Sequence, residues 1–274
     1  MSYISIEDVR RASGAPSSLI TDAYITSIIE VVEGEMERWV NTKFAPTQTI
    51  EALDGSGSNR IFTNKNPLLS VRELKTNDID ISVSSLNVYK PSGKIELGED
   101  SETAQFLAQS KDTIVKYIYG LLEESSTNTT SSAATTAGTD VAISVSSETG
   151  FADEDWIEIY GMDGHREVAQ INIDPTTGVI TVDQLVQAHE SGSTVVLLQI
   201  PYFIKRYMEI EAALSVAINA IGATYTFNAS YSLGELSVVK GVPYTHWQSS
   251  VEKLLKERDM RKNRIKIRPH IVVS

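Results

Sequence analysis

The pattern of apolar positions predicts a long amphipathic helix within residues 21–46, which read TDAYITSIIEVVEGEMERWVNTKFAP. Thr21 is expected to cap the start, and Pro46 excludes continuation, so the helix is predicted to end near Lys43. About 22 residues at ~1.5 Å each make a rod of roughly 33 Å, which needs a partner surface elsewhere in the chain. Spacings of three and four residues place one set of side chains on a single face: Ile25, Ile28, Ile29, Val32, Met36, Trp39 and Val40.

Further helices are predicted towards both ends of the chain. Ser5 and Asp8 have the form of a capping box before a short helix, and Gly14 suits its left-handed end. Pro201 suits the first position of a second long helix. A last helix is predicted after Pro243, with apolar residues on one face.

Alternation with a period of two predicts short strands in the rest of the chain. The first group falls at residues 47–53, 60–63, 68–75, 86–89, 94–97 and 113–119. A second group falls at residues 141–145, 156–160, 167–173, 179–182 and 194–198. Short strands separated by turns at this spacing are typical of a small barrel or sandwich.

Charge sets residues 123–197 apart from the rest of the chain. This block has 13 acidic residues and one basic residue, Arg166, whereas the other 199 residues have 23 of each kind. The block therefore holds the whole net charge of −12. We interpret it as an inserted module with its own composition.

Together these patterns predict an α+β fold. Its helical bundle core carries short β-strands and hairpins, and an inserted all-β domain, a small barrel or sandwich, interrupts it. The predicted parts are the helical core with small sheets at residues 1–122 and 199–262, a flexible Ser/Thr-rich linker at 123–140, the acidic β domain at 141–198 and an extended C-terminal arm at 263–274. Tyr119 and Ile200, where the insertion begins and ends, are expected to lie close together.

Composition argues against several kinds of chemistry. The chain has no cysteine, which removes disulfides, thiolate catalysis and cysteine metal sites. Its four histidines lie far apart without metal-ligand spacing, and there is no G-x-S-x-G elbow and no P-loop. We therefore expect no enzyme activity, no metal and no cofactor; a hydrolase with an unrecognised active site is a third hypothesis. Neither a signal peptide nor a membrane span is expected.

The acidic β domain suggests an alternative function as a carbohydrate- or calcium-binding module. Its carboxylates cluster without the spacing of an EF-hand loop: Asp153, Glu154, Asp155 and Glu158. Carbohydrate sites use exposed aromatic side chains, but the alternation with acidic residues also suits core positions. The aromatic residues concerned are Phe151, Trp156 and Tyr160.

The C-terminal end of the chain is basic. From Glu252 to Ser274 there are eight Lys or Arg and three acidic residues, which suits a solvated helix end or DNA binding. Apolar alternation favours a third interpretation, an extended arm that pairs with another protein's sheet or groove. The arm residues are Arg264, Ile265, Lys266, Ile267, Arg268, Pro269, His270, Ile271, Val272 and Val273.

The order of the outer motifs carries a family resemblance. The motifs are WVNTKFAP at residues 39–46, LDGSGSNRIF at 53–62, NPLLSVREL at 66–74 and Ile200-Pro201 before a long helix. This order resembles the head–tail connector, or adaptor, proteins of long-tailed bacteriophages. The inserted block, with TGFADEDWIEI, is similar to small β modules of phage structural proteins, although Glu154-Asp155 stands where those have Gly-Asp.

The resemblance implies a structural virion protein. Such adaptors form a ring, here expected to be a dodecamer, between the portal at the capsid vertex and the neck or tail. The ring extends the DNA channel, and DNA passes through its lumen without sequence-specific binding. The family's C-terminal arm docks onto the portal, and a stopper or tail-terminator protein binds below. The protein is expected at the portal vertex or neck of the virion, after assembly in the host cytoplasm, with no membrane partner.

A ring of identical subunits needs two different patches on each subunit. The polar flank of the first long helix is our candidate for part of that interface, and an ordinary solvated face is the alternative. The candidate interface residues are Glu30, Glu33, Glu37 and Arg38.

Overall fold

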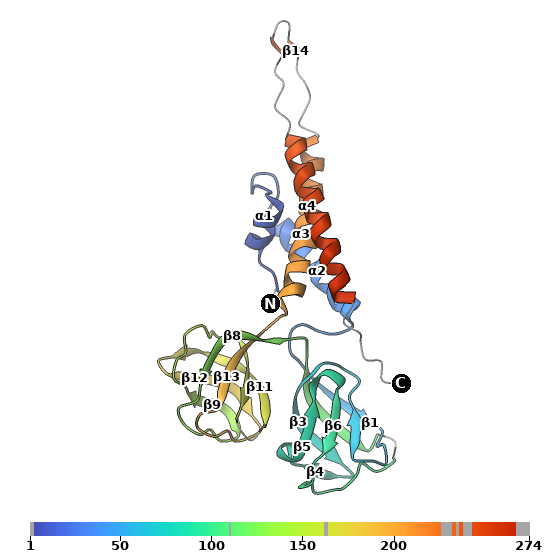
Figure 1. Ribbon diagram of the computed structural model, residues 1–274, viewed down its shortest axis with the longest axis vertical. Coiled ribbons are helices and arrows are strands. Elements are labelled where there is room, and N and C mark those ends of the chain that lie inside the picture. The colour runs from blue at the N-terminus through green and yellow to red at the C-terminus, as the bar shows by residue number, and fades with distance from the viewer. Residues whose placement is uncertain are drawn as a thin grey trace. The chain divides into compact units, whose positions relative to one another are not determined.

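The protein is described by a computed structural model of the 274-residue chain. The structure describes residues 3–109, 111–161, 164–225, 232–233, 236–237 and 243–266. The chain divides into two compact units (Figure 1). Unit 1 consists of Met1–Asn41 and Pro201–Ser274, and unit 2 is Thr42–Ile200.

The expected helical bundle core is wrong for this chain. The described residues are mostly β: three antiparallel sheets of four, six and three strands hold 13 strands, and a two-stranded ribbon adds two more, against four α-helices. A strand needs neighbours to complete its backbone hydrogen bonds, and three or more strands with a buried face are needed for stability. The short alternating segments therefore gather into sheets with hydrophobic cores of their own.

Unit 1 contains the four helices. They are α1 (Ile6–Ser13), α2 (Asp22–Val40), α3 (Tyr202–Tyr225) and α4 (Pro243–Lys266), with a two-stranded ribbon of β14 (Ser232–Leu233) and β15 (Leu236–Ser237). Helix α3 contacts each of the other three helices and runs beside α4 (Figure 1). Its small buried side chains allow this close approach: Ala212, Ala213, Ala217 and Ala220.

The helix ends follow the local sequence. The hydroxyls of Ser5 and Thr21 accept hydrogen bonds from backbone amides in the first turns of α1 and α2, which confirms both predicted caps. Gly14 ends α1 in the left-handed conformation, at φ 71°. Asn41 ends α2 in the same way, at φ 54°, earlier than the predicted end near Lys43.

Unit 2 begins with two sheets that share a core. The four-stranded sheet has the order β1 (Thr47–Leu53), β7 (Thr113–Tyr119), β3 (Leu68–Thr76), β4 (Ile79–Ile81). The three-stranded sheet has the order β2 (Arg60–Phe62), β6 (Lys94–Leu97), β5 (Leu86–Tyr89), and the turns η1 (Val83–Ser85) and η2 (Lys90–Ser92) flank β5. Phe106, Tyr117 and Ile95 lie buried in one cluster with residues of both sheets.

The six-stranded sheet forms the β module. Its order is β8 (Glu123–Thr130), β13 (Thr194–Gln199), β10 (Trp156–Tyr160), β11 (Arg166–Thr176), β12 (Val179–Leu185), β9 (Gly138–Ser144). Ile143, Ile157 and Ile171 are fully buried in its own hydrophobic cluster. The module thus has a core that is separate from that of the other two sheets.

The predicted flexible linker at residues 123–140 is corrected by the structure. Residues 123–130 form β8, which pairs antiparallel with β13, and Gly138 already begins β9. Backbone hydrogen bonds do not require apolar side chains, so a Ser/Thr-rich segment can pair as an edge strand. The pairing of Glu123 with Gln199 also brings together the first and last strands of the module, as expected for an insertion.

Two β-bulges in β3 join the four-stranded sheet to the β module. Along the pairing of β3 with β7, the register shifts between Leu68 and Ser70 and again between Val71 and Glu73. Leu69 and Arg72 are the extra residues, and a bulge re-aims the side chain that it carries. Leu69 is buried in a cluster with Ile118 of β7 and with two residues of the module, Val168 and Leu198.

Candidate interaction surfaces

The proposed portal-binding arm is described only at its first three residues. Helix α4 continues through Lys266, so Arg264, Ile265 and Lys266 are helical and not extended, as they were expected to be. Basic residues are favourable at this end of a helix because of the helix dipole. The other arm residues lie outside the described part of the chain: Ile267, Arg268, Pro269, His270, Ile271, Val272 and Val273.

Two of the four candidate interface residues on α2 have partners in their own chain. The buried Glu33 carboxylate, 9% exposed, accepts hydrogen bonds from the backbone amides of Tyr3 at 2.6 Å and Ile4 at 3.2 Å. The Glu37 carboxylate accepts a hydrogen bond from the Tyr3 hydroxyl at 3.0 Å. Glu33 and Glu37 therefore fasten the N-terminal segment to α2.

The other two candidates, Glu30 and Arg38, are exposed on α2. The Arg38 guanidinium donates a hydrogen bond to the carbonyl of Gly34 in the same helix, at 3.1 Å. At about 100° per residue, Glu30 shares the flank of Glu37, and Arg38 is rotated by about 80° from Glu30, onto the side of α2 that faces away from its buried residues. The structure thus separates the four residues that the sequence analysis had grouped.

A groove of about 480 Å³ runs along the flank of α2 opposite Glu30. Side chains from α2 and α3 line it, together with Lys262 of α4. Val31 is 55% exposed and Trp39 is 39% exposed, although both are apolar. The apolar lining residues are Ile28, Val31, Val32, Met36, Trp39 and Tyr207.

The polar residues that line the groove include two acidic ones, Glu35 of α2 and Glu211 of α3, together with Ser215 and the basic Lys262. Glu211 accepts a hydrogen bond from the Tyr207 hydroxyl at 2.7 Å. Burial raises the pKa of Tyr207, and the hydrogen bond to Glu211 raises it further. The rings of Tyr207 and Trp39 lie 5.7 Å apart at a tilt of 44°, so Tyr207 joins the aromatic and acidic parts of the groove.

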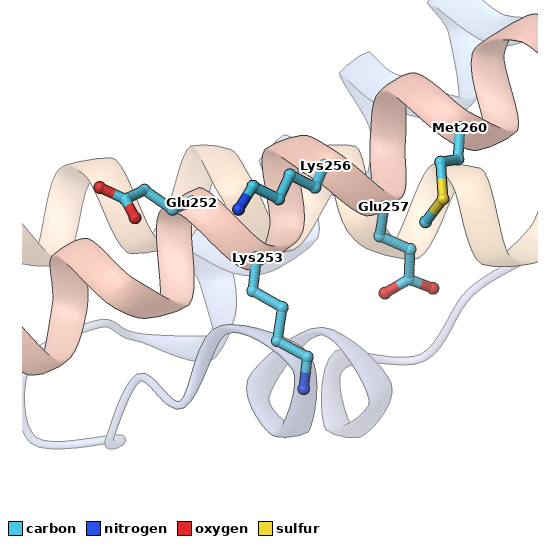
Figure 2. Close-up of a pocket in the computed structure, with 5 residues that line it drawn as sticks. All are labelled: Glu252, Lys253, Lys256, Glu257 and Met260. Atoms are coloured by element: carbon cyan, nitrogen blue, oxygen red, sulfur yellow. The ribbon is translucent and has the colours of Figure 1, made fainter.

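A shallower hollow of about 340 Å³ lies on α4, and all five residues that line it belong to this helix (Figure 2). Lys253, Lys256 and Met260 follow the i, i+3, i+7 spacing of one helix face. Met260 is 64% exposed. Glu252 and Glu257 complete the lining.

Glu257 ties α4 to α3. Its carboxylate accepts hydrogen bonds from Arg206 of α3 at 3.1 Å and from Arg261 at 2.9 Å. Burial opposes ionisation of Glu257, but the hydrogen bonds from the two guanidinium groups outweigh it and lower the pKa of this carboxyl. The α4 face with Lys253, Lys256 and Met260 is therefore held on a helix that ion pairs anchor to α3.

The candidate calcium carboxylates of the β module do not gather at one point. Glu158 is buried and forms ion pairs with Lys90 and with Arg166, the latter at 3.3 Å. Asp155 accepts a hydrogen bond from the Ala152 amide at 2.8 Å, and burial raises its pKa despite this hydrogen bond. Within the described residues, no group of three or more His, Asp or Glu side chains has the arrangement of a metal site.

The candidate aromatic residues of the β module have contacts within the chain. Phe151 is buried in the core of the module. Trp156 is partly buried against the cluster that joins the module to the four-stranded sheet. The Arg166 guanidinium lies 4.3 Å from the ring centroid of Tyr160. These placements explain the three residues as packing positions.

A buried polar cluster that the sequence analysis missed joins the four-stranded sheet to the β module. Arg72 donates hydrogen bonds to the Glu167 carboxylate and to the Gln184 carbonyl, both at 2.9 Å, and to the Val168 carbonyl at 3.0 Å. His189 lies with its Nε2 3.4 Å from Glu167. These groups are buried, so we interpret the cluster as a structural junction.

No known family model matches this sequence, and no curated protein matches it significantly.

Among the described helices, none has the length and apolarity that crossing a bilayer requires.

Proposed function

We propose that this chain is a structural ring adaptor of a long-tailed bacteriophage, located between the portal and the neck or tail. The observation that carries the proposal is that unit 1 exposes apolar side chains on two separate surfaces. One is the groove with Val31 and Trp39, and the other is the α4 face with Met260. A subunit of a closed ring requires two different patches, one for each neighbour.

The order of elements supports the same proposal. A short capped helix is followed by the long helix α2, a strand begins at Thr47, a hairpin strand follows the Gly-rich turn, and β3 follows Pro67. After the β module, α3 begins directly behind Pro201. These are the elements on which the likeness to the phage adaptors rests.

In the proposed assembly the subunits form a ring, of twelve copies by the resemblance, and the ring extends the DNA channel without sequence-specific contacts. The C-terminal arm binds the portal, and a stopper or tail-terminator protein binds the other side. The chain acts as a structural protein of the virion and not as an enzyme.

The test is copurification with the portal protein encoded in the same viral genome, followed by electron microscopy. The expected result is a ring stacked on the portal ring. A chain that ends at Lys266 keeps all of α4 and is expected to fold but to lose portal binding. The matched control is the variant Arg60→Ala, which removes a cation from an exposed strand residue of unit 2. A full chain that stays monomeric and ignores the portal would contradict the proposal.

A further inference from the structure

We infer that the groove along α2 binds the exposed face of α4 from a second copy of the chain. This inference rests on the proposed ring and names the contact within it. The groove residues that matter are Val31, Glu35 and Trp39. The α4 residues are Lys253, Lys256 and Met260.

Charge is the first argument. Helix α2 carries five acidic residues and one basic residue, a net charge of −4. Helix α4 carries seven basic and three acidic residues, a net charge of +4, and its exposed face presents Lys253 and Lys256 next to Glu252 and Glu257. Opposite charges on two helices favour their association and set its register, whereas like-charged copies of either helix repel.

The position of the charges agrees with this pairing. Most of the acidic side chains of α2 already have partners in their own chain: Asp22 pairs with Arg10, and Glu33 and Glu37 bind the N-terminal segment. Glu35 is exposed and lines the groove. Glu211 of α3 also lines it, but pairs with Arg258 of its own chain at 3.9 Å. Glu35 is thus the acidic side chain that we place opposite a lysine of the entering helix face.

Apolar chemistry is the second argument. Helix-in-groove recognition lays the apolar part of a helix face into an apolar groove, and Met260, which is 64% exposed, supplies an apolar side chain beside Lys253 and Lys256. A methionine side chain is flexible, and its sulfur makes favourable contacts with aromatic rings. We place Met260 of one copy against Trp39 and Val31 of the next, with a lysine of the same face opposite Glu35.

In the proposed ring each copy uses both surfaces once, its groove for one neighbour and its α4 face for the other. A head-to-tail contact of this kind generates a ring when the rotation between copies closes.

Cysteine cross-linking tests the contact in the full-length protein, which has no native cysteine. The variants Val31→Cys and Met260→Cys are oxidised separately and as a mixture. The expected result is a covalent dimer in the mixture and little in either variant alone. The control Ile173→Cys, exposed in the β module, is expected to give none with either partner. Equal cross-linking of Val31→Cys with itself, or no cross-link in the mixture, would overturn the inference.

Charge exchange gives a second, independent test. Glu35→Lys and Lys256→Glu are each expected to weaken self-association about tenfold in sedimentation equilibrium, because each places like charges opposite one another. A chain with both changes should self-associate with an affinity within about threefold of that of the unmodified protein. Lys65→Glu, on an exposed residue of unit 2, controls for net charge. Loss of association in the double variant as large as in the single ones would count against the pairing.

Three further outcomes test this inference apart from the ring proposal. Rings that form on the portal unchanged with Glu35→Lys or Lys256→Glu would overturn the inferred contact and leave the adaptor role intact. A chain that ends at Lys266 could also label faster than the full chain at Val31→Cys in a thiol-labelling experiment. This result would show that the chain's own C-terminal residues occupy the groove, and it would also overturn the inferred contact between copies. A full chain that never binds the portal but gives the mixed cross-link would overturn only the adaptor role.

Discussion

Arg72 and Glu167 form an ion pair of 2.9 Å between side chains that are each only 1% exposed, although 95 residues separate them along the chain. Arg72 comes from a bulge in β3, and Glu167 comes from β11 of the β module. The Glu167 carboxylate also accepts backbone hydrogen bonds from Val186 at 2.6 Å and Gln187 at 3.1 Å. The inserted module is thus joined to the four-stranded sheet by a buried ionic contact as well as by the chain itself, which passes from β7 to β8.

Replacing Arg72 with Met is expected to lower the free energy of unfolding of unit 2 by about 3–5 kcal/mol, because the change leaves the Glu167 charge buried without its partner. Urea unfolding followed by circular dichroism measures the effect. Arg72→Met with Glu167→Gln should recover at least about 1 kcal/mol, because no unpaired charge then remains. The control Lys75→Met, on a half-exposed side chain of the same strand, should change stability by less than about 0.5 kcal/mol. A single Arg72→Met variant as stable as the control would refute the buried junction.

Replacing Glu33 with Ala is expected to release the N-terminal segment from α2. The change removes the acceptor of the Tyr3 and Ile4 amides, and a buried donor without an acceptor costs about 1–3 kcal/mol. Hydrogen exchange of these two amides should become faster than in the unmodified protein. Glu35→Ala, on an exposed residue of the same helix, is the matched control and should leave both amides protected. Unchanged protection in Glu33→Ala would mean that other contacts hold the segment.

Glu257 is expected to contribute a pH-dependent part of the stability of unit 1. Its pKa in the folded protein lies below the ordinary value of 4.5, so its contribution is present above that pH and is lost as the pH falls through the folded value. The variant Glu257→Gln should be less stable by about 1 kcal/mol at pH 7. The difference in the free energy of unfolding between Glu257→Gln and the unmodified protein should shrink when unfolding is measured below about pH 4.5. A difference that is constant, or that grows on acidification, would contradict the ion pairs with Arg206 and Arg261.

The boundaries of the β module predict how it behaves when it is produced alone. Residues 141–198 lack β8 and the start of β9, whereas residues 123–199 keep all six strands. With Glu167→Gln in both, to avoid an unpaired buried charge, the longer fragment should show the dispersed NMR spectrum of a folded domain. The shorter fragment should not, because β13 loses its partner at the sheet edge. Equal folding of the two fragments would show that β8 is dispensable.

Local patterns located most elements correctly. The predicted strand at residues 47–53 matches β1, and the capping residues Ser5 and Thr21 were correctly identified. Caps and alternating strands depend on residues that are near neighbours in the chain, so a single sequence contains the information. The Ser/Thr-rich strand β8 was not predicted because its side chains lack the apolar alternation that is typical of a half-buried strand.

The interaction surfaces were harder to predict. The charge pattern predicts an interface on the flank of α2 that contains Glu30, Glu33 and Glu37, because charged side chains on a helix are usually exposed. In the structure Glu33 and Glu37 bind the N-terminal segment, and the exposed apolar residues Val31 and Trp39 lie on the other flank. Which flank of a helix is exposed depends on how many neighbouring segments pack against it. The spacing of apolar residues along the helix does not show how many there are.

The sequence by itself therefore determined the helices with their caps, most of the strands and the unequal distribution of charge. Only the tertiary structure decided that the strands gather into three sheets, and that Leu69 and Arg72 of β3 turn towards the β module. The physical reason is the β-bulge. Side chains along a strand alternate between the two faces of the sheet, and the extra residue of a bulge shifts this alternation, so that its side chain points to the face that the regular alternation would not give it. A bulge is defined by the pairing with a partner strand, so the role of Arg72 depends on the pairing of β3 with β7.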